Sequence, residues 1–390
     1  MNETQTVPGR YRDAALGFRN HWYPAMRSRD IGEDAFKTLT VLGEDLLFKR
    51  IDGQVFAIRN ACIHRGYRFS ERIECYTRNT ITCPVHAFTY NLRTGALVTI
   101  PSDPHSPLIG KAGVHSYPVE ELNGLVFVFI GDLVPPPPLA DDVPPRFLDA
   151  GLFVVAAINV ECGCNWRVAA DSGFDPNHIF LHKDNGLMRH FGIAFPFATR
   201  LKDGDTFAEI ELFEGAGPKG LTDRLSETEP VYAHVFECDG ETGRMSSMFA
   251  PDGADGHAAQ AFGAVSGSLW LPGVLNVDPW PIPGMSHFEW WVPIDEHTHR
   301  YFICWGKWTT EPLEQLAFRN EVETKWVALG YESFNRYDVE LNNGMQAFNA
   351  DPEHVYGSRQ IMCRTDGYTI AWQRLASKHN RGLQRRYGGR

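Results

Sequence analysis

The sequence lacks the long apolar segments that cross membranes. No run of roughly 18 or more apolar residues occurs, and the N-terminal stretch MNETQTVPGRYRDAALGFRNHWYP has no basic-then-apolar signal. An excess of positive charge is also missing. The chain has 37 Lys and Arg against 48 Asp and Glu, a net charge of -11, which argues against a non-specific nucleic-acid binder. These absences favour an acidic cytoplasmic enzyme that contacts neither membrane nor nucleic acid.

Cysteine is scarce, with 8 residues among 390. A disulfide framework is unexpected in a long cytoplasmic chain, so metal binding and burial are the two explanations to weigh. Cys162 and Cys164 would share a strand face, but no free Cys or His pair with ligand spacing completes a metal site with them. Four cysteines without matched neighbours are predicted to be small buried hydrophobic residues: Cys75, Cys238, Cys304 and Cys363.

Residues 22 to about 131 have the pattern of a small β domain. DLLFKRIDGQVFAIRN predicts a hairpin turning at Asp52-Gly53, FTYNLRTGALVTI predicts another at Thr94-Gly95, and GLVFVFIGD is typical of a buried strand. The next segment, DLVPPPPLADDVPPRF, contains six prolines and predicts a stiff, extended connection. We therefore expect two domains, 1–150 and 151–390.

The second unit mixes strands with helices. Strands are predicted in GLFVVAAINVEC, FAEIELF and SHFEWWVPIDEHTHRYFICWGKW, and helices near residues 166–188, 311–349 and 368–381. Because the strands gather in the middle and helices follow, we expect an α+β fold with an antiparallel sheet. The glycine-rich stretch over residues 251–267 is interpreted as a loop of unknown role.

Two Cys/His pairs lie in CIHRGYRFSERIECYTRNTITCPVH: Cys62 with His64, then Cys83 with His86. Structural zinc can use such residues, but its usual signature is a close cysteine pair followed by a histidine pair. Here each half supplies one thiolate and one imidazole. A [2Fe–2S] cluster that has two thiolates on one iron and two imidazoles on the other needs this arrangement. The spacing therefore favours a Rieske cluster over zinc.

A second candidate metal site lies in NWRVAADSGFDPNHIFLH, where His178 and His182 are four residues apart and share one face of a helix. Two imidazoles with one carboxylate form the open site of non-haem Fe(II) oxygenases. Isolated histidines of this kind are usually core or surface residues, but an Fe–S motif in the same chain favours metal binding. Asp175, which precedes a proline, is explained first as a helix N-cap.

Together with GFRNHWYP, WLPGVL and WVPIDE, these motifs make residues 18–382 resemble the terminal oxygenases of the Rieske non-haem iron ring-hydroxylating family, in its carbazole dioxygenase branch. The resemblance implies an all-β Rieske domain followed by a helix-grip catalytic domain. It also implies insertion of both atoms of O₂ into a planar polycyclic or heterocyclic arene, with angular attack on carbazole-like substrates.

The resemblance assigns roles to single residues. Asp338, in YESFNRYDVELNNGMQAF, matches the carboxylate ligand, with Glu340 as the alternative; both could also be solvated helix charges. Asp175 matches the aspartate that links the iron site to a cluster histidine of a neighbouring subunit. Eight residues match positions around the substrate, although each is equally typical of a core: Gly173, Phe174, Leu275, Val277, Trp280, His287, Phe334 and Asn335.

Electrons must come from another protein, because no G-x-G-x-x-G motif for flavin or nicotinamide follows a strand. The resemblance implies a ferredoxin fed by an NAD(P)H reductase, and a homotrimer. Four arginines near the Cys/His loops would steer such a partner unless they only balance Glu71 and Glu74: Arg65, Arg68, Arg72 and Arg78.

Two rival functions remain open from the sequence. A Rieske monooxygenase or demethylase would share every metal ligand and differ only in its pocket. A Rieske electron carrier would have no mononuclear iron.

Overall fold

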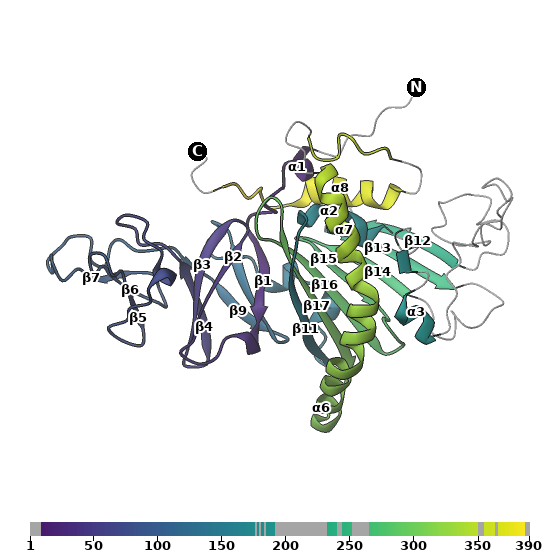
Figure 1. Ribbon diagram of the computed structural model, residues 1–390, viewed down its shortest axis with the longest axis horizontal. Helices are drawn as coiled ribbons and strands as arrows, with labels where there is room; N and C mark the ends of the chain where they lie inside the picture. The colour runs from purple at the N-terminus through teal and green to yellow at the C-terminus, as the bar shows by residue number, and fades with distance from the viewer. Residues whose placement is uncertain are drawn as a thin grey trace.

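The computed structural model describes residues 9–175, 178, 181–182, 185–191, 232–239, 244–251, 265–349, 355–362 and 366–386. The molecule is elongated, with N-terminal β-sheets at one end and a larger sheet with helices at the other (Figure 1). The predicted strand at 207–213 and most of the glycine-rich stretch 251–267 lie outside these ranges. No helix within them is both long and apolar enough to span a membrane.

Three antiparallel sheets form the N-terminal unit. The first sheet contains β1 (His21–Arg27), β10 (Leu125–Ile130) and β9 (Val119–Leu122). The second contains β2 (Phe36–Val41), β3 (Glu44–Ile51), β4 (Gln54–Arg59) and β8 (Ser116–Tyr117). The third contains β5 (Thr80–Thr82), β6 (Thr89–Asn91) and β7 (Leu97–Thr99). Two 3-10 turns accompany them, η1 (Ser28–Asp30) and η2 (Phe69–Glu71), whereas the short helix α1 (Gly9–Arg12) lies beside the C-terminal helix α8 (Gly367–His379) (Figure 1).

The turns explain why these strands pair. Asp52 and Gly53 have φ of 52° and 77°, so they form the predicted two-residue turn between β3 and β4. The β6–β7 hairpin is also confirmed, with a longer loop. Gly95 within that loop has φ of 73°, and a Cβ there would lie 2.1 Å from the Val114 carbonyl oxygen. Only glycine fits this position.

The prediction that the proline-rich connection is extended is only partly correct. The connection contains two 3-10 turns, η3 (Leu139–Asp142) and η4 (Pro145–Leu148), because proline is well suited to begin a helical turn although it cannot continue one. Phe147 packs 5.1 Å from Trp290, ring centroid to centroid, and joins the two units in one buried cluster. Because this core continues across residue 150, the division into 1–150 and 151–390 stays a prediction.

A single antiparallel sheet organises the second unit, which confirms the α+β class. Its strand order is β11-β17-β16-β15-β14-β13-β12. These strands are β11 (Leu152–Cys162), β12 (Tyr232–Asp239), β13 (Arg244–Pro251), β14 (Val265–Trp270), β15 (Val274–Asp278), β16 (Met285–Pro293) and β17 (His299–Trp308). The described helices are α2 (Trp166–Phe174), α3 (Gly186–Phe191), α6 (Pro312–Glu321), the π-helix η6 (Val322–Asn335), α7 (Arg336–Asn349) and α8 (Gly367–His379).

Strand β16 is buried on both faces, since alternate residues belong to two different cores. Phe288 and Trp290 pack with the N-terminal unit, whereas Met285 and Trp291 pack with the helices. His287 and Glu289 occupy the same alternation as Met285 and Trp291. Helix α7 crosses in front of the sheet in Figure 1. The helix-facing side of β16 is therefore where a site between sheet and helices would form.

The cysteines differ in burial. Cys304 is buried as predicted, and Cys162 and Cys164 are buried in the helix-side core. Cys75 is exposed, so its predicted burial is wrong. It lies in the loop between η2 and β5, and loops of this kind run over the surface. The side chain of Cys238 and all of Cys363 lie outside the described part of the chain.

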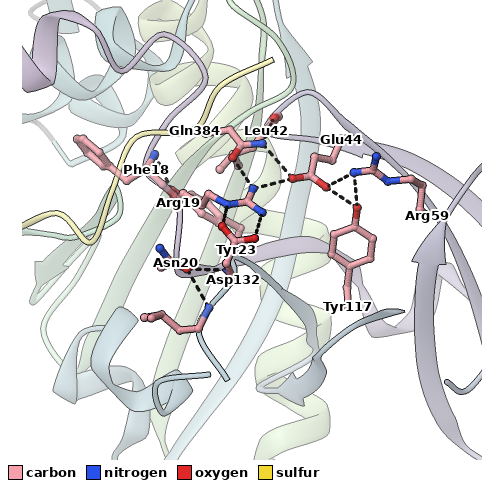
Figure 2. Close-up of polar contacts among 11 residues, drawn as sticks. Phe18, Arg19, Asn20, Tyr23, Leu42, Glu44, Arg59, Tyr117, Asp132 and Gln384 are labelled. Carbon is pink, nitrogen blue, oxygen red and sulfur yellow. Dashed lines mark hydrogen bonds and ion pairs between the residues drawn. The ribbon is translucent and has the colours of Figure 1, made fainter. Parts of the chain in front are cut away.

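Glu44 is a buried carboxylate that ties three parts of the chain together (Figure 2). It accepts hydrogen bonds from Arg19 at 2.8 Å, Arg59 at 2.9 Å and Gln384 at 3.1 Å, and another from the Tyr117 hydroxyl. Burial alone would raise the pKa of Glu44, but these donors outweigh it and lower the pKa. The C-terminal segment is thereby held against the N-terminal unit.

Asp171 on α2 is a second polar tie. It accepts hydrogen bonds from the hydroxyls of Tyr11 and Tyr356, both at 2.7 Å, and from the Gln373 amide at 3.1 Å. Burial raises the pKa of Asp171 to about 6 even though these donors favour its charged form. Segments near both ends of the chain therefore meet at α2.

Replacing Glu44 by Ala should destabilise the protein by about 3–5 kcal/mol, because buried donors lose their acceptor. The control is Glu323→Ala, which removes the ion pair of Glu323 with Arg29; both side chains are 45% exposed, so less than about 1 kcal/mol is expected. Urea unfolding followed by circular dichroism measures both. Equal shifts in the two variants would contradict the importance of Glu44.

Asp171 should make stability depend on pH. Its folded pKa of about 6 exceeds the roughly 3.9 of an unfolded aspartate. The stabilising contribution is thus complete below about pH 4 and is lost as the pH rises to about 6. Relative to Asp171→Asn, the wild type should lose on the order of 2 kcal/mol across this window. Unfolding midpoints of both proteins at pH 4, 5, 6 and 7 test this; parallel profiles would contradict it.

Candidate metal centres and substrate site

Two loops of matching geometry carry the Cys/His pairs. In the loop after β4, the Cys62 N–H donates to the Tyr67 carbonyl at 2.9 Å and the Gly66 N–H donates to the Cys62 carbonyl at 2.8 Å. Between β5 and β6, the Cys83 N–H donates to the Phe88 carbonyl at 2.8 Å, and Ala87 donates to Cys83 at 2.9 Å. The two loops thus share one hydrogen-bond pattern although their Cys-to-His spacings differ.

The four side chains form two layers. Cys62 and Cys83 are buried, at 3% and 1% exposure, whereas His64 and His86 are exposed with ring centroids 4.6 Å apart. Burial raises the pKa of Cys83, and the pKa of His64 is lowered by desolvation and by the neighbouring His86 and Arg65. Inner sulfurs beneath outer imidazoles fit a cluster whose two irons have different ligands.

Other groups hold these ligands in place. The His64 ring stacks on Phe88, with centroids 4.8 Å apart and an 8° interplanar angle. The Tyr90 hydroxyl lies 3.1 Å from Cys62 Sγ and would donate to a thiolate there. Hydrogen bonds to cluster sulfurs influence the reduction potential.

Most of the nearby arginines are neutralised. Arg68 contacts Asp45 at 2.7 Å and Glu71 at 3.2 Å, and Arg72 contacts Glu74 at 2.8 Å. Arg78 pairs with three carboxylates: Glu33, Asp34 and Asp52. Of the four, only Arg65 has no ion pair within the described chain. Charge balance therefore accounts for three of these arginines.

His178, His182 and Asp338 converge between α2 and α7. One ligand atom of each lies within 4.8 Å of the others. Asp338 Oδ1 is 3.1 Å from His182 Nε2 and 3.6 Å from His178 Nε2. The continuous helix predicted here is wrong: α2 ends at Phe174, and residues 178, 181 and 182 have 3-10 backbone. Asp175 is the C-cap residue of α2, and the His178 N–H donates to its carbonyl at 3.2 Å. The predicted N-cap role of Asp175 involves residues 176 and 177, which lie outside the described part of the chain.

The histidine orientations suit a metal. The Asp175 backbone carbonyl lies at His178 Nδ1, and the Asn185 amide lies 3.0 Å from His182 Nδ1. Both rings therefore keep Nε2 directed at Asp338. The Asp175 carbonyl accepts the Nδ1 proton of His178, so the His178 Nε2 lone pair is available for a divalent ion. At His182 the Asn185 amide nitrogen faces Nδ1, and turning this amide over presents its oxygen there and frees Nε2 of His182 in the same way. Phe334 stacks on His182, with ring centroids 3.7 Å apart.

Asp338 fits the carboxylate position better than Glu340. Burial opposes the charge on Asp338, but His182 and His178 outweigh it and lower the pKa of Asp338. Asn335 donates to Asp338 Oδ2 at 3.4 Å. Glu340 instead pairs with Arg336 at 3.2 Å, and its side chain is 63% exposed. A 2-His-1-carboxylate site can therefore form from the three converging residues.

Of the eight predicted substrate residues, Phe334 and Asn335 touch His182 and Asp338, and most of the others lie in the same helix-side core. Trp280 lies 5.0 Å from Phe334, ring to ring, and Asn335 follows Phe334 in the chain. Leu275 and Val277 are paired across strands with Glu289 and His287. Phe174 is buried at the end of α2. Gly173 is tightly packed, since a Cβ there would lie 2.6 Å from Trp291.

Three residues of this region escape sequence reasoning. Glu289 accepts from the Tyr301 hydroxyl at 2.5 Å and from Asn335 at 3.1 Å, and it contacts His287 at 2.5 Å. A charged residue two positions after a histidine in an apolar strand is a signal for Glu289. Tyr301 and Asn185 carry no such signal, because their partners lie elsewhere in the sequence or across a turn.

Comparisons with known proteins match both units. A Rieske [2Fe-2S] domain matches residues 21–118, and a homotrimeric ring hydroxylase matches residues 129–384. The terminal oxygenase components of carbazole 1,9a-dioxygenase from Metapseudomonas resinovorans and a Sphingomonas species are 41% and 39% identical, covering 96% of this chain and 94% and 95% of theirs.

Solved structures of carbazole dioxygenase oxygenases are also similar to this chain. The terminal oxygenase of carbazole 1,9a-dioxygenase from Novosphingobium sp. KA1 is 36% identical with a TM-score of 0.79, covering 97% of both chains. A reduced complex between oxygenase and ferredoxin in carbazole 1,9a-dioxygenase matches at 38% identity and a TM-score of 0.78, covering 96% of this chain and 93% of that one.

Asp338→Ala should abolish the mononuclear site and spare the cluster. Iron should fall from about three to about two atoms per chain, because a cluster holds two and the carboxylate site one. Glu340→Ala, two residues away on the same helix, is the control and should keep about three. Iron analysis with the visible spectrum measures both centres. Iron loss in the Glu340 variant instead would assign the ligand to that residue.

Proposed function

The chain belongs to the homotrimeric ring hydroxylases, a family of Rieske oxygenases, and on this basis we propose that it is the terminal oxygenase of a multicomponent aromatic-ring dioxygenase. Its substrates are planar tricyclic arenes of the carbazole type, attacked at the angular position beside the bridging atom. The main support is the pairing of two ligand sets in one chain, one for a redox cluster and one for an open metal site.

We assign the ligands as follows. Cys62, His64, Cys83 and His86 hold the Rieske cluster, and His178, His182 and Asp338 hold Fe(II). When bound, the cluster supplies single electrons and the ferrous ion supplies O₂ activation. An electron carrier has no use for the convergent second set, so its presence favours the oxygenase over the carrier.

The chain's own side chains position the reaction. Asp175 and Asn185 hold the Nδ1 sides of the two histidines, and Asn335 holds the Asp338 carboxylate. The rings of Phe334 and Trp280, tilted by 54° to each other, form an apolar wall beside His182. Such a wall favours a planar arene and excludes water from the reacting carbons.

The match to a homotrimeric family supports assembly into a trimer, and the shape of the chain is compatible with it. The tip that carries β5 to β7 and the end that carries α3 lie at opposite ends of the molecule in Figure 1. In a closed ring of three, electrons would pass from the cluster of one subunit to the iron site of its neighbour, with Asp175 as the link that the resemblance implies. The cluster of each subunit would then supply electrons to the iron site of the next subunit.

A ferredoxin is the proposed electron donor, with an NAD(P)H reductase behind it in the cytoplasm. The surface around the exposed His64 and His86 is suited to a brief encounter. It presents Ile63 at 45% and Val85 at 51% exposure, together with Arg65. A small apolar patch beside a cation that has no ion pair among the described residues is typical of transient redox contacts.

Product analysis under ¹⁸O₂, with carbazole, ferredoxin and reductase, tests the proposal. Both atoms of one O₂ should enter adjacent ring carbons, and His178→Ala should abolish turnover while the cluster spectrum persists. A single labelled oxygen would instead indicate a monooxygenase or demethylase. Physiological activity that survives in His178→Ala would indicate an electron carrier.

A further inference from the structure

The last turn of helix α2 is fastened to two segments that are distant in the sequence. Asp171, in this turn, accepts hydrogen bonds from the hydroxyls of Tyr11 and Tyr356, both at 2.7 Å. The Gln373 amide donates to the same carboxylate at 3.1 Å. Hydrogen bonds to an ionised carboxylate are roughly twice as strong as neutral ones. A single side chain therefore joins α2 to the start of the chain and to its C-terminal part.

One of these partners precedes the N-terminal unit in the sequence. Tyr11 lies in α1, ahead of β1, yet α1 lies beside α8, and α8 packs on α2 (Figure 1). Tyr11 is fully buried there, and its backbone N–H donates to the Ser377 hydroxyl at 2.9 Å. The Trp372 indole N–H donates to the Tyr11 hydroxyl at 3.3 Å. The hydroxyl of Tyr11 is therefore held in one position against Asp171.

A short series of hydrogen bonds leads from this turn to a candidate iron ligand. The Asp175 N–H donates to the Ser172 carbonyl at 3.1 Å, and the His178 N–H donates to the Asp175 carbonyl at 3.2 Å. The Asp175 carbonyl also lies at Nδ1 of His178. Because Ser172 adjoins Asp171 in the chain, a shift of the last turn of α2 moves the carbonyl that orients the His178 ring.

We propose, resting on the iron assignment of the proposed function, that Asp171 is a positioning residue for the mononuclear site, with Tyr11 and Tyr356 as its anchors. By fixing the last turn of α2, it sets the direction of His178 Nε2. Loss of groups that orient metal ligands typically costs about 10- to 100-fold in metal affinity. Since Asp171 acts through several bonds, we expect about tenfold. The segment ahead of the Rieske domain thus supports the iron site of its own chain.

A purely structural role makes a different prediction. Asp171 and its two phenols could serve only to close the fold where the ends of the chain meet. Their loss would then lower the free energy of unfolding without a selective effect on iron. Tyr23 provides the comparison, because it is also buried and its hydroxyl donates to the Phe18 carbonyl at 2.6 Å rather than to a carboxylate.

The test measures how fast Fe(II) leaves the protein. Wild type and variants are loaded anaerobically, and the transfer of iron to a ferrous chelator is followed by absorbance, with the cluster spectrum recorded in parallel. Tyr11→Phe and Tyr356→Phe should each release Fe(II) several-fold faster than the wild type, and Asp171→Ala about tenfold faster. Asp171→Asn offers an oxygen to one phenol and an NH₂ to the other, so its release rate should stay close to that of the wild type.

Spectroscopy gives a second readout at the metal. Nitric oxide added to the Fe(II) protein without O₂ serves as a paramagnetic probe, and the EPR line shape depends on the geometry of the protein ligands. Tyr11→Phe and Asp171→Ala should change this line shape. The control, Tyr23→Phe, should keep the line shape and the Fe(II) release rate of the wild type, although it too loses a buried hydrogen bond and should be less stable in urea.

Two results would overturn the positioning role: unchanged Fe(II) release in both Tyr11→Phe and Tyr356→Phe, or an equal acceleration in Tyr23→Phe. The phenylalanine variants decide the question even if Asp171→Ala fails to fold. Failure of the iron assignment looks different. In that case the wild type holds no more chelatable Fe(II) than Asp338→Ala, and the positioning role falls with it.

Discussion

The contact of the Asp338 carboxylate with His182 is the interaction on which the catalytic unit depends. It joins residues 156 positions apart, so it forms only when α7 lies across the helix-facing side of the sheet with α2 beside it. Three further residues support this contact. Phe334 stacks on His182, Asn335 donates to Asp338, and Glu289 accepts from Asn335. The sheet provides a rigid wall, and the helices bring the ligands to it.

Three polar side chains in this wall connect to the candidate metal ligand Asp338 through successive contacts. Asn335 touches Asp338 directly, Glu289 touches Asn335, and His287 touches Glu289. Each of these side chains therefore helps to orient the next one. All three are buried, which limits the rotamers that they can adopt. A single strand, β16, contributes two of these groups on one face, and on the other it contributes apolar residues that join the two units of the chain.

Local chemistry makes much of the molecule predictable. The hairpin at Asp52-Gly53 depends on two neighbouring residues, and the candidate cluster ligands on short motifs, so both can be read from the sequence. Asp338 could be separated from Glu340 only by resemblance; their different surroundings become visible in the fold. The break after Phe174, the exposure of Cys75 and the 3-10 turns among the prolines depend on tertiary packing. The contacts of Glu289 with Tyr301 and Asn335 also depend on tertiary packing, because these residues lie on different elements of the chain.

The hydrogen bond between Glu44 and Gln384 has a consequence for folding during synthesis of the chain. Gln384 follows Glu44 by 340 residues, so the ribosome adds it roughly 20–70 s later at about 5–20 residues per second. Arg381, which contacts the buried Asp142 at 2.9 Å, arrives equally late. During that time the nascent N-terminal unit lacks both contacts. The interior of the N-terminal unit is therefore completed only when nearly the whole chain has been synthesised.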